Sequence, residues 1–473
     1  MDFNANTGEI SMERVSENMS NLDYIYWSSP VEGFDIDDIP NSRSYLWSVS
    51  APSNIIGVDG NWAAYNGIMT LGSGYIARVP SNGTNFDVTN TFTGKPNNGL
   101  VTVGVVQSVG SQALQNKHWN LVGNPYPSAL SADKFLDHNT NLEGAVYIWQ
   151  SNASTYTSSN PDPYYANFAT SYSNAYITNN ALGSVPNVPD GFDGNIASGQ
   201  GFFVKVKDGP NDDTVEFRNT MRYGVSQAVL PNDEFERNGR GVENQIEDQE
   251  KQLLWLFLAN EMQQSSVTLV GYADGATNGK DRLYDAFANV GLGELSLHTF
   301  VEENNMVIQG RSLPFNDEDT VPMGIQIPEN GIYRIGIDQL KGDIFLDSAT
   351  NIILEDTYTG VFHDLKSNPY TFNAESGVFN DRFVLRYNAN QLNTKDVELR
   401  DTFAFIKDNI LTVQSGATID GLSVYDITGK KIIGLEPTGS TNRIETDFNY
   451  SRGAYIAVIT LEGNRTTSIK LIN

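Results

Sequence analysis

Carboxylates gather in several short loops of this 473-residue chain. Two segments place them among glycines, Asp190-Gly-Phe-Asp-Gly-Asn195 and Asp274-Gly-Ala-Thr-Asn-Gly-Lys-Asp281. Oxygen ligands on Gly-rich turns suit a hard cation such as calcium. The predicted calcium ligands are Asp190, Asp193, Asp274 and Asp281. Neither segment matches an EF-hand loop, so Asx turns that merely hold the loops together are an alternative.

Paired carboxylates could also serve a glycosidase. The clusters Asp35/Asp37/Asp38, Asp190/Asp193 and Asp274/Asp281/Asp285 lack a sequence context that would raise one pKa and leave the partner ionised. With 57 acidic residues, clusters of this kind arise by chance. We therefore expect no enzyme activity from them.

The four histidines give no catalytic or zinc pattern. They are His118, His138, His298 and His363, and no pair has the spacing of a helical zinc motif. The Gly-x-Ser-x-Gly elbow that often presents a nucleophilic serine is absent from the sequence. We expect His118, beside Trp119, to be a packed residue and not a general base.

Composition excludes some function classes. There are no cysteines, which rules out disulfides and thiolate metal sites. The net charge of −27 should repel nucleic acid and anionic membrane surfaces. The sequence contains no apolar stretch of about 20 residues, so no integral membrane helix is expected.

Tryptophans could stack on sugar rings, which makes surface glycans candidate partners. The candidates are Trp27, Trp47, Trp62 and Trp149. Their neighbours alternate with apolar residues, so we expect most of them in the core.

Residues 21–227 contain an internal repeat with a period near 100 residues. Tyr45-Leu-Trp47 returns as Tyr147-Ile-Trp149, and Gly72–Val79 returns as Gly199–Val206, with the same order of echoes. This predicts two similar β units that bury their aromatic faces against each other. The Gly-x-Gly pairs precede β-branched and aromatic residues, so tight turns into strands are favoured over phosphate loops.

Other segments predict turns and a short helix. Asn124-Pro-Tyr-Pro127 favours turn geometry after a strand, and Ser131 can cap a helical turn over Ala132–Leu136. Further on, short strands separated by turn residues predict a sandwich over residues 253–388. The predicted strands there are Leu253–Leu258, Ser266–Tyr272, Gly324–Ile327, Gly331–Ile337, Ile344–Leu346, Ile352–Leu354 and Arg382–Tyr387.

Polar stretches suggest the domain boundaries. We expect a tether or partial strand over residues 1–20, the repeated aromatic-rich module over 21–227, and a polar linker over 228–252. A β-sandwich follows over 253–388, then a linker over 389–401 and a final domain over 402–473. The predicted fold class is all-β, with two sandwich or jelly-roll-like modules followed by a small sandwich.

The end of the chain contains three short apolar segments bounded by Gly or Asn, which predict strands. They read Val-Tyr-Asp-x-x-Gly-Lys at 424–430, Gly-x-Tyr at 453–455 and Lys-Leu-Ile at 470–472. Glu462-Gly-Asn-Arg465 predicts a hairpin turn between the last two strands.

This sequence pattern resembles that of the type A C-terminal sorting domain of the Bacteroidetes type IX secretion system. The matching residues are Val424, Tyr425, Asp426, Gly429, Lys430, Gly453, Tyr455, Lys470, Leu471 and Ile472. One departure is Ser451, where many members of that family have proline. The resemblance covers residues 402–473.

The resemblance implies a small Greek-key β-sandwich that acts as a secretion signal. It implies export across the outer membrane, with the translocon and its cargo shuttle protein as partners, to the cell surface or the medium. Gly123–Ser128, Ala197–Val204 and Phe217–Arg222 resemble a recurrent module of flavobacterial surface proteins with such tails. On this interpretation the chain is the C-terminal region of a larger adhesin or gliding-type protein.

Two other functions stay open at this point. Residues 21–227 could form a lectin-like module, or the chain could be the non-catalytic end of a secreted hydrolase. Three Asp-Ser/Thr-small patterns resemble Bacteroidetes O-glycosylation sites, with Thr214, Thr320 and Ser348 as acceptors.

Overall fold

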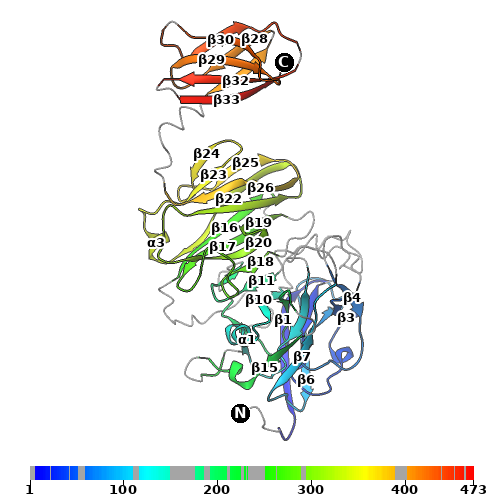
Figure 1. The fold of residues 1–473 in the computed structure, drawn as a ribbon. Coiled ribbons are helices and arrows are strands. Elements are labelled where there is room, and N and C mark those ends of the chain that lie inside the picture. The colour runs from blue at the N-terminus through cyan, green and yellow to red at the C-terminus, as the bar shows by residue number, and fades with distance from the viewer. Residues whose placement is uncertain are drawn as a thin grey trace. The chain divides into compact units, whose positions relative to one another are not determined.

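The computed structural model describes most of the chain. The described residues are 6–21, 23–41, 43–51, 59–109, 117–149, 176–185, 192–209, 213–224, 228–230, 232, 251–262, 264–288, 295–388, 402–407, 409–437, 439–451, 453–462 and 465–472. Their secondary structure is almost entirely strand, which confirms the all-β class. The chain divides into two compact units (Figure 1). Unit 1 comprises Met1–Thr357 and His363–Tyr387, and unit 2 comprises Tyr358–Phe362 and Asn388–Asn473.

The first repeat of unit 1 pairs its outer strands and forms a four-stranded sheet. Strand β1 (Ile10–Met19) pairs with β6 (Phe86–Gly94), and the sheet has the order β2-β5-β3-β4. Its strands are β2 (Tyr24–Trp27), β3 (Arg43–Ser48), β4 (Asn61–Ala64) and β5 (Tyr75–Arg78), with the short 3-10 helix η1 (Ile36–Asp38) between β2 and β3.

The second repeat has the same plan. Strand β7 (Val101–Val105) pairs with β15 (Asp213–Phe217), and the sheet has the order β8-β14-β10-β11, extended by β12. Its strands are β8 (Trp119–Gly123), β10 (Leu142–Trp149), β11 (Tyr176–Asn179), β12 (Ser184–Val185) and β14 (Gly201–Val206). The short strands β9 (Leu130–Ser131) and β13 (Asn195–Ile196) pair with each other, and η5 (Asn219–Arg222) follows β15. In both repeats the first, fourth, second and third strands of the sheet lie side by side in that order.

A helix occupies the same place in each repeat. Helix α1 (Ala132–His138) lies between β8 and β10, as η1 lies between β2 and β3. The Ser131 hydroxyl accepts a hydrogen bond from the Lys134 amide, which confirms the predicted cap. Gly72 and Gly199 have φ angles of 75° and 76°, so both Gly-x-Gly pairs make tight left-handed turns into strands.

The two repeats contact each other through reciprocal bonds. The bridge Trp27–Gln200 has its counterpart in Ser73–Val122, at matching positions of the two repeats. The indole N–H of Trp47 donates to the Trp119 carbonyl at 2.8 Å. The indole N–H of Trp149 donates to the Tyr24 carbonyl, also at 2.8 Å. These contacts relate the repeats by an approximate two-fold axis and bury an aromatic cluster between their sheets.

The strands from β16 to β26 form one large sheet of order β24-β23-β26-β21-β19-β20-β17-β16-β22-β25, with β18 paired to β20. The sheet belongs to unit 1 except for the first two residues of β24, which are assigned to unit 2. Buried side chains from strands far apart in this order share one core, so the sheet curls around it. The strands are β16 (Gln252–Asn260), β17 (Ser265–Ala273), β18 (Ala286–Phe287), β19 (Ser296–Val301), β20 (Asn304–Ser312), β21 (Thr320–Ile327), β22 (Gly331–Lys341), β23 (Ile353–Asp356), β24 (Val361–Asp364), β25 (Tyr370–Ala374) and β26 (Gly377–Arg386).

The strand expected at Ile344–Leu346 is wrong, because these residues belong to helix α3 (Asp343–Leu346). Gly342, with φ 95°, turns the chain after β22, and the Leu346 amide then donates back to the Gly342 carbonyl. Phe345 is fully buried from this single helical turn. A three-residue apolar run has no periodicity that separates helix from strand.

The repeats and the large sheet share a hydrophobic core. One cluster of buried side chains includes Trp149 and Leu182 from the second repeat together with Trp255 and Leu269 from the large sheet. The Trp255 indole donates to the Ser184 carbonyl at 2.9 Å. The segments expected as two modules therefore lie within one compact unit.

Unit 2 contains a sandwich of two sheets, of orders β27-β28-β31 and β30-β29-β32-β33 (Figure 1). Its strands are β27 (Phe403–Lys407), β28 (Ile410–Gln414), β29 (Ile419–Asp426), β30 (Lys431–Leu435), β31 (Arg443–Asp447), β32 (Ala454–Leu461) and β33 (Arg465–Ile472). Side chains such as Leu411, Val424 and Ile459 are fully buried between the sheets. Among the described residues, every helix is too short or too polar to cross a membrane.

Because the two indole hydrogen bonds are equivalent, we expect the loss of either one to reduce the stability of unit 1 by a similar amount. Trp47→Phe and Trp149→Phe should each lower the free energy of unfolding of unit 1 by about 2 kcal/mol or more, because each leaves a buried carbonyl unpaired and a void beside it. Calorimetry measures this, and the transition of unit 2 should stay where it is. Phe405→Leu, an exposed change in unit 2, is the control. A large cost at only one tryptophan would contradict the two-fold relation.

Candidate functional site

The ten residues of the tail motif meet at one end of one sheet. Asp426 of β29 lies opposite Tyr455 of β32, which lies opposite Leu471 of β33. The next rank is Tyr425, Ile456 and Lys470. Residues 45 positions apart in the chain, such as Asp426 and Leu471, are thus brought into one row across three antiparallel strands.

Asp426 organises the turn between β29 and β30. Its carboxylate accepts hydrogen bonds from the Thr428 amide, the Thr428 hydroxyl and the Lys430 amide. The Thr428 hydroxyl and these amides favour the ionised form and lower the pKa of Asp426. Gly429 has φ 84°, a left-handed conformation that favours glycine at this position. The Asp-x-x-Gly-Lys pattern is therefore explained by the hydrogen bonds and the backbone conformation of this turn.

Tyr455 anchors the start of β32. Its hydroxyl donates to the Ser451 carbonyl at 2.6 Å, and its ring packs edge-on against Phe448 with centroids 5.0 Å apart. Gly453 precedes the strand in open space, where an added Cβ would meet nothing within 4 Å. The serine at position 451 thus supplies a backbone acceptor, which a proline there would supply equally.

The last motif residues lie on an edge strand. In the order β30-β29-β32-β33, β33 has no strand beyond it among the described residues. Leu471 is buried against the core, Lys470 is exposed, and Ile472 pairs through its backbone with Ala454.

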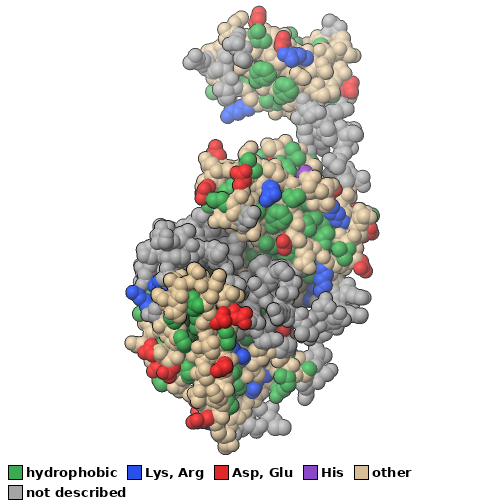
Figure 2. Space-filling model, turned by 180° about the vertical axis from the view of Figure 1, so that it is seen from behind, with side chains coloured by type: hydrophobic (Ala, Val, Ile, Leu, Met, Phe, Trp, Pro, Cys, Tyr) green, Lys and Arg blue, Asp and Glu red, His purple; other side chains and the backbone are tan. Residues whose placement is uncertain are grey.

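Charge is distributed unevenly between the tail and the rest of the chain. Residues 402–473 contain seven Lys or Arg and seven Asp or Glu, so this segment is formally neutral. The net charge of −27 therefore resides in residues 1–401. Acidic side chains gather in several groups on the face of unit 1 drawn in Figure 2.

The predicted calcium ligands do not form a cluster in the part of the chain that the structure describes. Asp193 accepts from the Asn195 amide at 2.7 Å, and Asp281 accepts from the Thr277 amide. Asp274 uses its backbone carbonyl to accept from the Tyr284 hydroxyl, and Asp190 lies outside the described residues. No group of three or more His, Asp or Glu side chains suited to a metal is found among the described residues. Asx-type turns account for the contacts seen, and calcium binding stays a prediction.

Asp285 is the most perturbed of the loop carboxylates. It is 3% exposed, and its two oxygens accept from the amides of Asp281 and Gly310 at 2.6 and 2.9 Å. Burial raises the pKa of Asp285 to about 7, although the two amides oppose this shift.

The structure joins Ser108, His118 and Asp208, which the sequence did not connect. The Ser108 hydroxyl lies 3.2 Å from His118 Nδ1, and His118 Nε2 lies 2.8 Å from Asp208. The Ser108 amide also donates to His118 Nδ1 at 3.0 Å, and the hydroxyl lies 3.0 Å from Asp59. The ring nitrogen and the hydroxyl are therefore already engaged, and Ser108 is only 7% exposed.

This chain of bonds ties the ends of β7, β8 and β14 together. Burial lowers the pKa of His118, against the opposing effect of Asp208, so the ring is neutral near pH 7. His118 has φ 65° and lies at the position that Asp23 occupies in the first repeat. The backbone carbonyl of each accepts an amide at the end of the fourth strand of its sheet, from Val79 just after β5 and from Val206 at the end of β14. The histidine is buried, as expected, and its contacts are those of a structural junction.

The other histidines are dispersed. His298 is buried in β19 with its ring edge-on to Phe300, and burial lowers its pKa to about 4. His138, at the end of α1, contacts Glu216 at 2.8 Å, and His363 contacts the Asn368 carbonyl at 2.8 Å.

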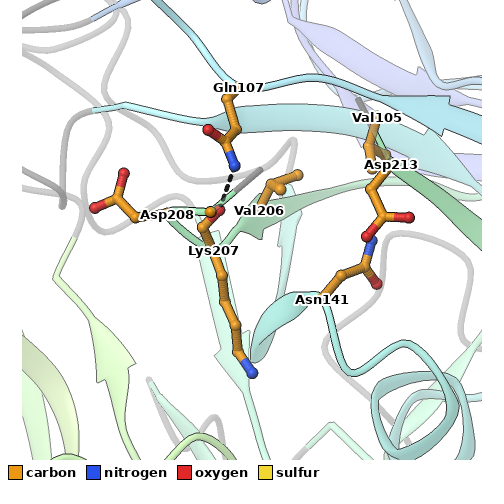
Figure 3. Close-up of a pocket in the computed structure, with 8 residues that line it drawn as sticks. Val105, Gln107, Asn141, Val206, Lys207, Asp208 and Asp213 are labelled. Atoms are coloured by element: carbon orange, nitrogen blue, oxygen red, sulfur yellow. Dashed lines mark hydrogen bonds between the residues drawn. The ribbon is translucent and has the colours of Figure 1, made fainter. Parts of the chain in front are cut away.

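A small pocket lies beside the junction, between β7, the loop before β10 and the end of β14 (Figure 3). Its volume is about 200 Å³. Gln107 donates across it to the Lys207 carbonyl at 2.8 Å, and Asn141 donates to the Thr214 carbonyl at 3.2 Å. The side-chain amides of Gln107 and Asn141 are thus engaged in bonds within the protein.

The tryptophans considered for sugar stacking are core residues. Trp27, Trp47 and Trp149 are buried, which confirms the expectation for most of them, and Trp62 is half-buried. Tyr26 stacks on Trp149 with centroids 5.4 Å apart, and Trp62 packs edge-on to Trp47. None of the three buried rings presents a face to solvent.

The predicted glycosylation sites differ in exposure. Thr214 in β15 and Ser348 after α3 are exposed, whereas Thr320 at the start of β21 is half-buried. Asp319, beside Thr320, forms an ion pair with Arg311 and accepts from the Tyr272 hydroxyl. Glycosylation stays a prediction at all three.

Residues 1–387 match the sequence profile of a family described as a domain of unknown function (DUF8693). The chain belongs to this family. No curated protein matches the chain. The DUF8693 match ends at the residue where unit 1 ends, Tyr387, so residues 388–473 lie outside it. The DUF8693 region therefore comprises the two repeats and the curled sheet.

The Asp-x-x-Gly turn predicts a difference between two glycines of the motif. Gly429→Ala should destabilise unit 2 by about 1–2 kcal/mol, because alanine must adopt a left-handed conformation there. Gly453→Ala is the matched control and should change stability by less than about 0.5 kcal/mol. Urea unfolding of the two variants tests this, and equal effects would contradict the role assigned to Gly429.

Asp285 predicts a pH dependence for unit 1. The folded chain holds this proton more tightly than the unfolded chain, whose carboxyl has its ordinary pKa of 3.8. The free energy of unfolding should therefore fall as pH rises from about 4 to about 7, and this contribution should be constant above that. Asp285→Asn removes it, so wild type should lose stability relative to the variant across this window. Parallel pH profiles from urea unfolding would refute the assignment.

Proposed function

We propose that the chain is a cargo of the type IX secretion system, with residues 402–473 as the sorting signal and the DUF8693 region as the passenger. The observation that supports this most is the convergence of the ten motif residues on one end of a single sheet. The residues on which the resemblance rests therefore form one continuous region of the folded tail.

The separation of the tail supports the same proposal. The tail belongs to the second compact unit, whose only residues from the DUF8693 region are Tyr358–Phe362, and the DUF8693 match stops before the tail. A sorting domain that is attached to different passenger proteins must fold without contributing to their hydrophobic cores. Among the described residues, the buried clusters of the DUF8693 region contain no residue of the tail.

The passenger is proposed to be a structural or adhesive surface module without catalysis of its own. Among the described residues, the tryptophans considered for sugar stacking pack in the core, which disfavours the lectin alternative. The proposed destination is the cell surface or the medium, and the proposed partners are the outer-membrane translocon and its cargo shuttle.

Localisation of a fluorescent reporter fused to residues 402–473 tests the proposal. The fusion would carry a periplasmic signal peptide and be expressed in a flavobacterial host with and without the translocon. We expect surface or medium localisation only when the translocon is present. A second fusion with Gly429→Ala and Leu471→Asp should be retained in the periplasm. Periplasmic retention of the unaltered fusion in both strains, with full-length chain behaving alike, would refute the proposal.

A further inference from the structure

Four side chains form a row across the outer face of the tail sheet, one strand each. Tyr425 of β29 lies opposite Lys431 of β30 on one side and Ile456 of β32 on the other, and Ile456 lies opposite Lys470 of β33. We name these four residues the Lys431–Lys470 row. Cross-strand partners share a face, and the adjacent Val424 and Ala457 are fully buried in the core, so the row faces outward.

The row has an apolar centre between two cations. Ile456 is 45% exposed, Tyr425 is half-buried, and both lysines are exposed. Neither lysine forms an ion pair with another described residue. Lys431 folds back over Gly434 on the same face, where an added Cβ would lie 2.8 Å from its amine. Three strand spacings separate the two lysine positions, roughly 14 Å.

A bulge creates this arrangement. The pairing of β29 with β30 shifts between Val424 and Tyr425, so Ile433 lies opposite Val424 while Lys431 lies opposite Tyr425. The extra residue turns Lys431 onto the outer face instead of continuing the alternation of the strand. Without it, the outer edge of the row would lack its cation.

We propose that the Lys431–Lys470 row is a docking surface for a protein that carries carboxylates on both sides of an apolar spot. This inference rests on the proposed function, and within it the partner is a component that receives the cargo. The row is complementary to such a surface in charge, and its exposed isoleucine supplies an apolar contact at the centre.

Charge favours an acidic protein over an anionic membrane as the occupant. Two lysines attract anionic lipid weakly, and the charge of −27 in the rest of the chain is repelled by it. A protein partner can place its carboxylates within reach of two particular ammonium groups, which a fluid lipid surface does not do. The acidic unit 1 of a second copy is a further occupant that the experiments below distinguish.

Export of the full-length chain from a translocon-competent flavobacterial host is the primary test. Lys431→Glu with Lys470→Glu should lower export at least about tenfold, because like charges would then face each other at the contact. The conservative pair Lys431→Arg with Lys470→Arg should restore export to within about twofold of wild type. Arg334→Glu with Lys341→Glu, two exposed changes on β22, is the control of equal net charge and should be exported normally.

The outcomes separate the two proposals. Normal export of the Lys431→Glu/Lys470→Glu chain, with wild type exported through the translocon, overturns the docking surface and leaves the sorting function standing. Translocon-independent behaviour of wild type overturns the sorting function itself. Equal loss in the Arg334→Glu/Lys341→Glu control attributes the effect to net charge and also overturns the docking surface. Unchanged thermal unfolding of each variant establishes that the exposed changes leave the fold intact.

Contact mapping tests the kind of occupant. A photoreactive benzoylphenylalanine at position 456 should crosslink to protein in exporting cells, and this should depend on Lys431 and Lys470. The same probe at Ile410, which is 42% exposed on the other sheet, is the matched control and should not crosslink. Lysine-dependent sedimentation of the purified chain with phosphatidylglycerol vesicles would overturn the assignment to a protein. Lysine-dependent dimers in light scattering would identify a second copy as the occupant and likewise overturn it.

Discussion

The indole N–H of Trp47 donates to the Trp119 carbonyl, and that of Trp149 donates to the Tyr24 carbonyl, so each repeat completes the hydrogen bonding of the other. Both acceptors are the first residue of the first sheet strand, where an unpaired buried carbonyl would be costly. Neither repeat can satisfy this group by itself. The aromatic cluster, and the curled sheet that packs on it through Trp255, therefore depend on both repeats being present.

Equivalent positions of the two repeats agree where the repeats contact each other and differ elsewhere. Trp47 and Trp149 keep the same bond, and Gly72 and Gly199 keep the same φ, because both are needed at the two-fold contact. Away from it, equivalent positions diverge. Asp23 caps its own turn by accepting from the Ser20 amide, whereas His118 joins Ser108 to Asp208. In the described residues, the equivalent positions Asp23 and His118 thus make different side-chain contacts.

Features that are local or repeated could be predicted from the sequence. The Ser131 cap, the burial of most tryptophans and the all-β class follow from short patterns with one physical cause each. The repeat was visible because its echoes keep their order and spacing.

Features that arise from distant segments were not reachable in the same way. Ser108, His118 and Asp208 lie at the ends of three different strands. Their spacing in the sequence does not predict that they are in contact. The Ile344–Leu346 run was too short to show a period, and its helix is dictated by Gly342 before it and by the core that receives Phe345. In the tail, the motif named Lys470 but not Lys431 or Ile456, because the bulge at β30 decides which side chain faces Tyr425.

In the tail sheet, the residues that make up the sequence motif and the residues that are exposed to a partner are largely different. Much of the motif is turn and core chemistry: Asp426 and Gly429 make the turn, and Tyr455 and Leu471 fill the sandwich. These residues fix the register, and the register in turn decides which exposed side chains stand in line. A partner can only contact the exposed set. If recognition occurs on this face, the buried motif residues act by positioning Lys431, Ile456 and Lys470, and their substitution would weaken recognition only to the extent that it disturbs that register.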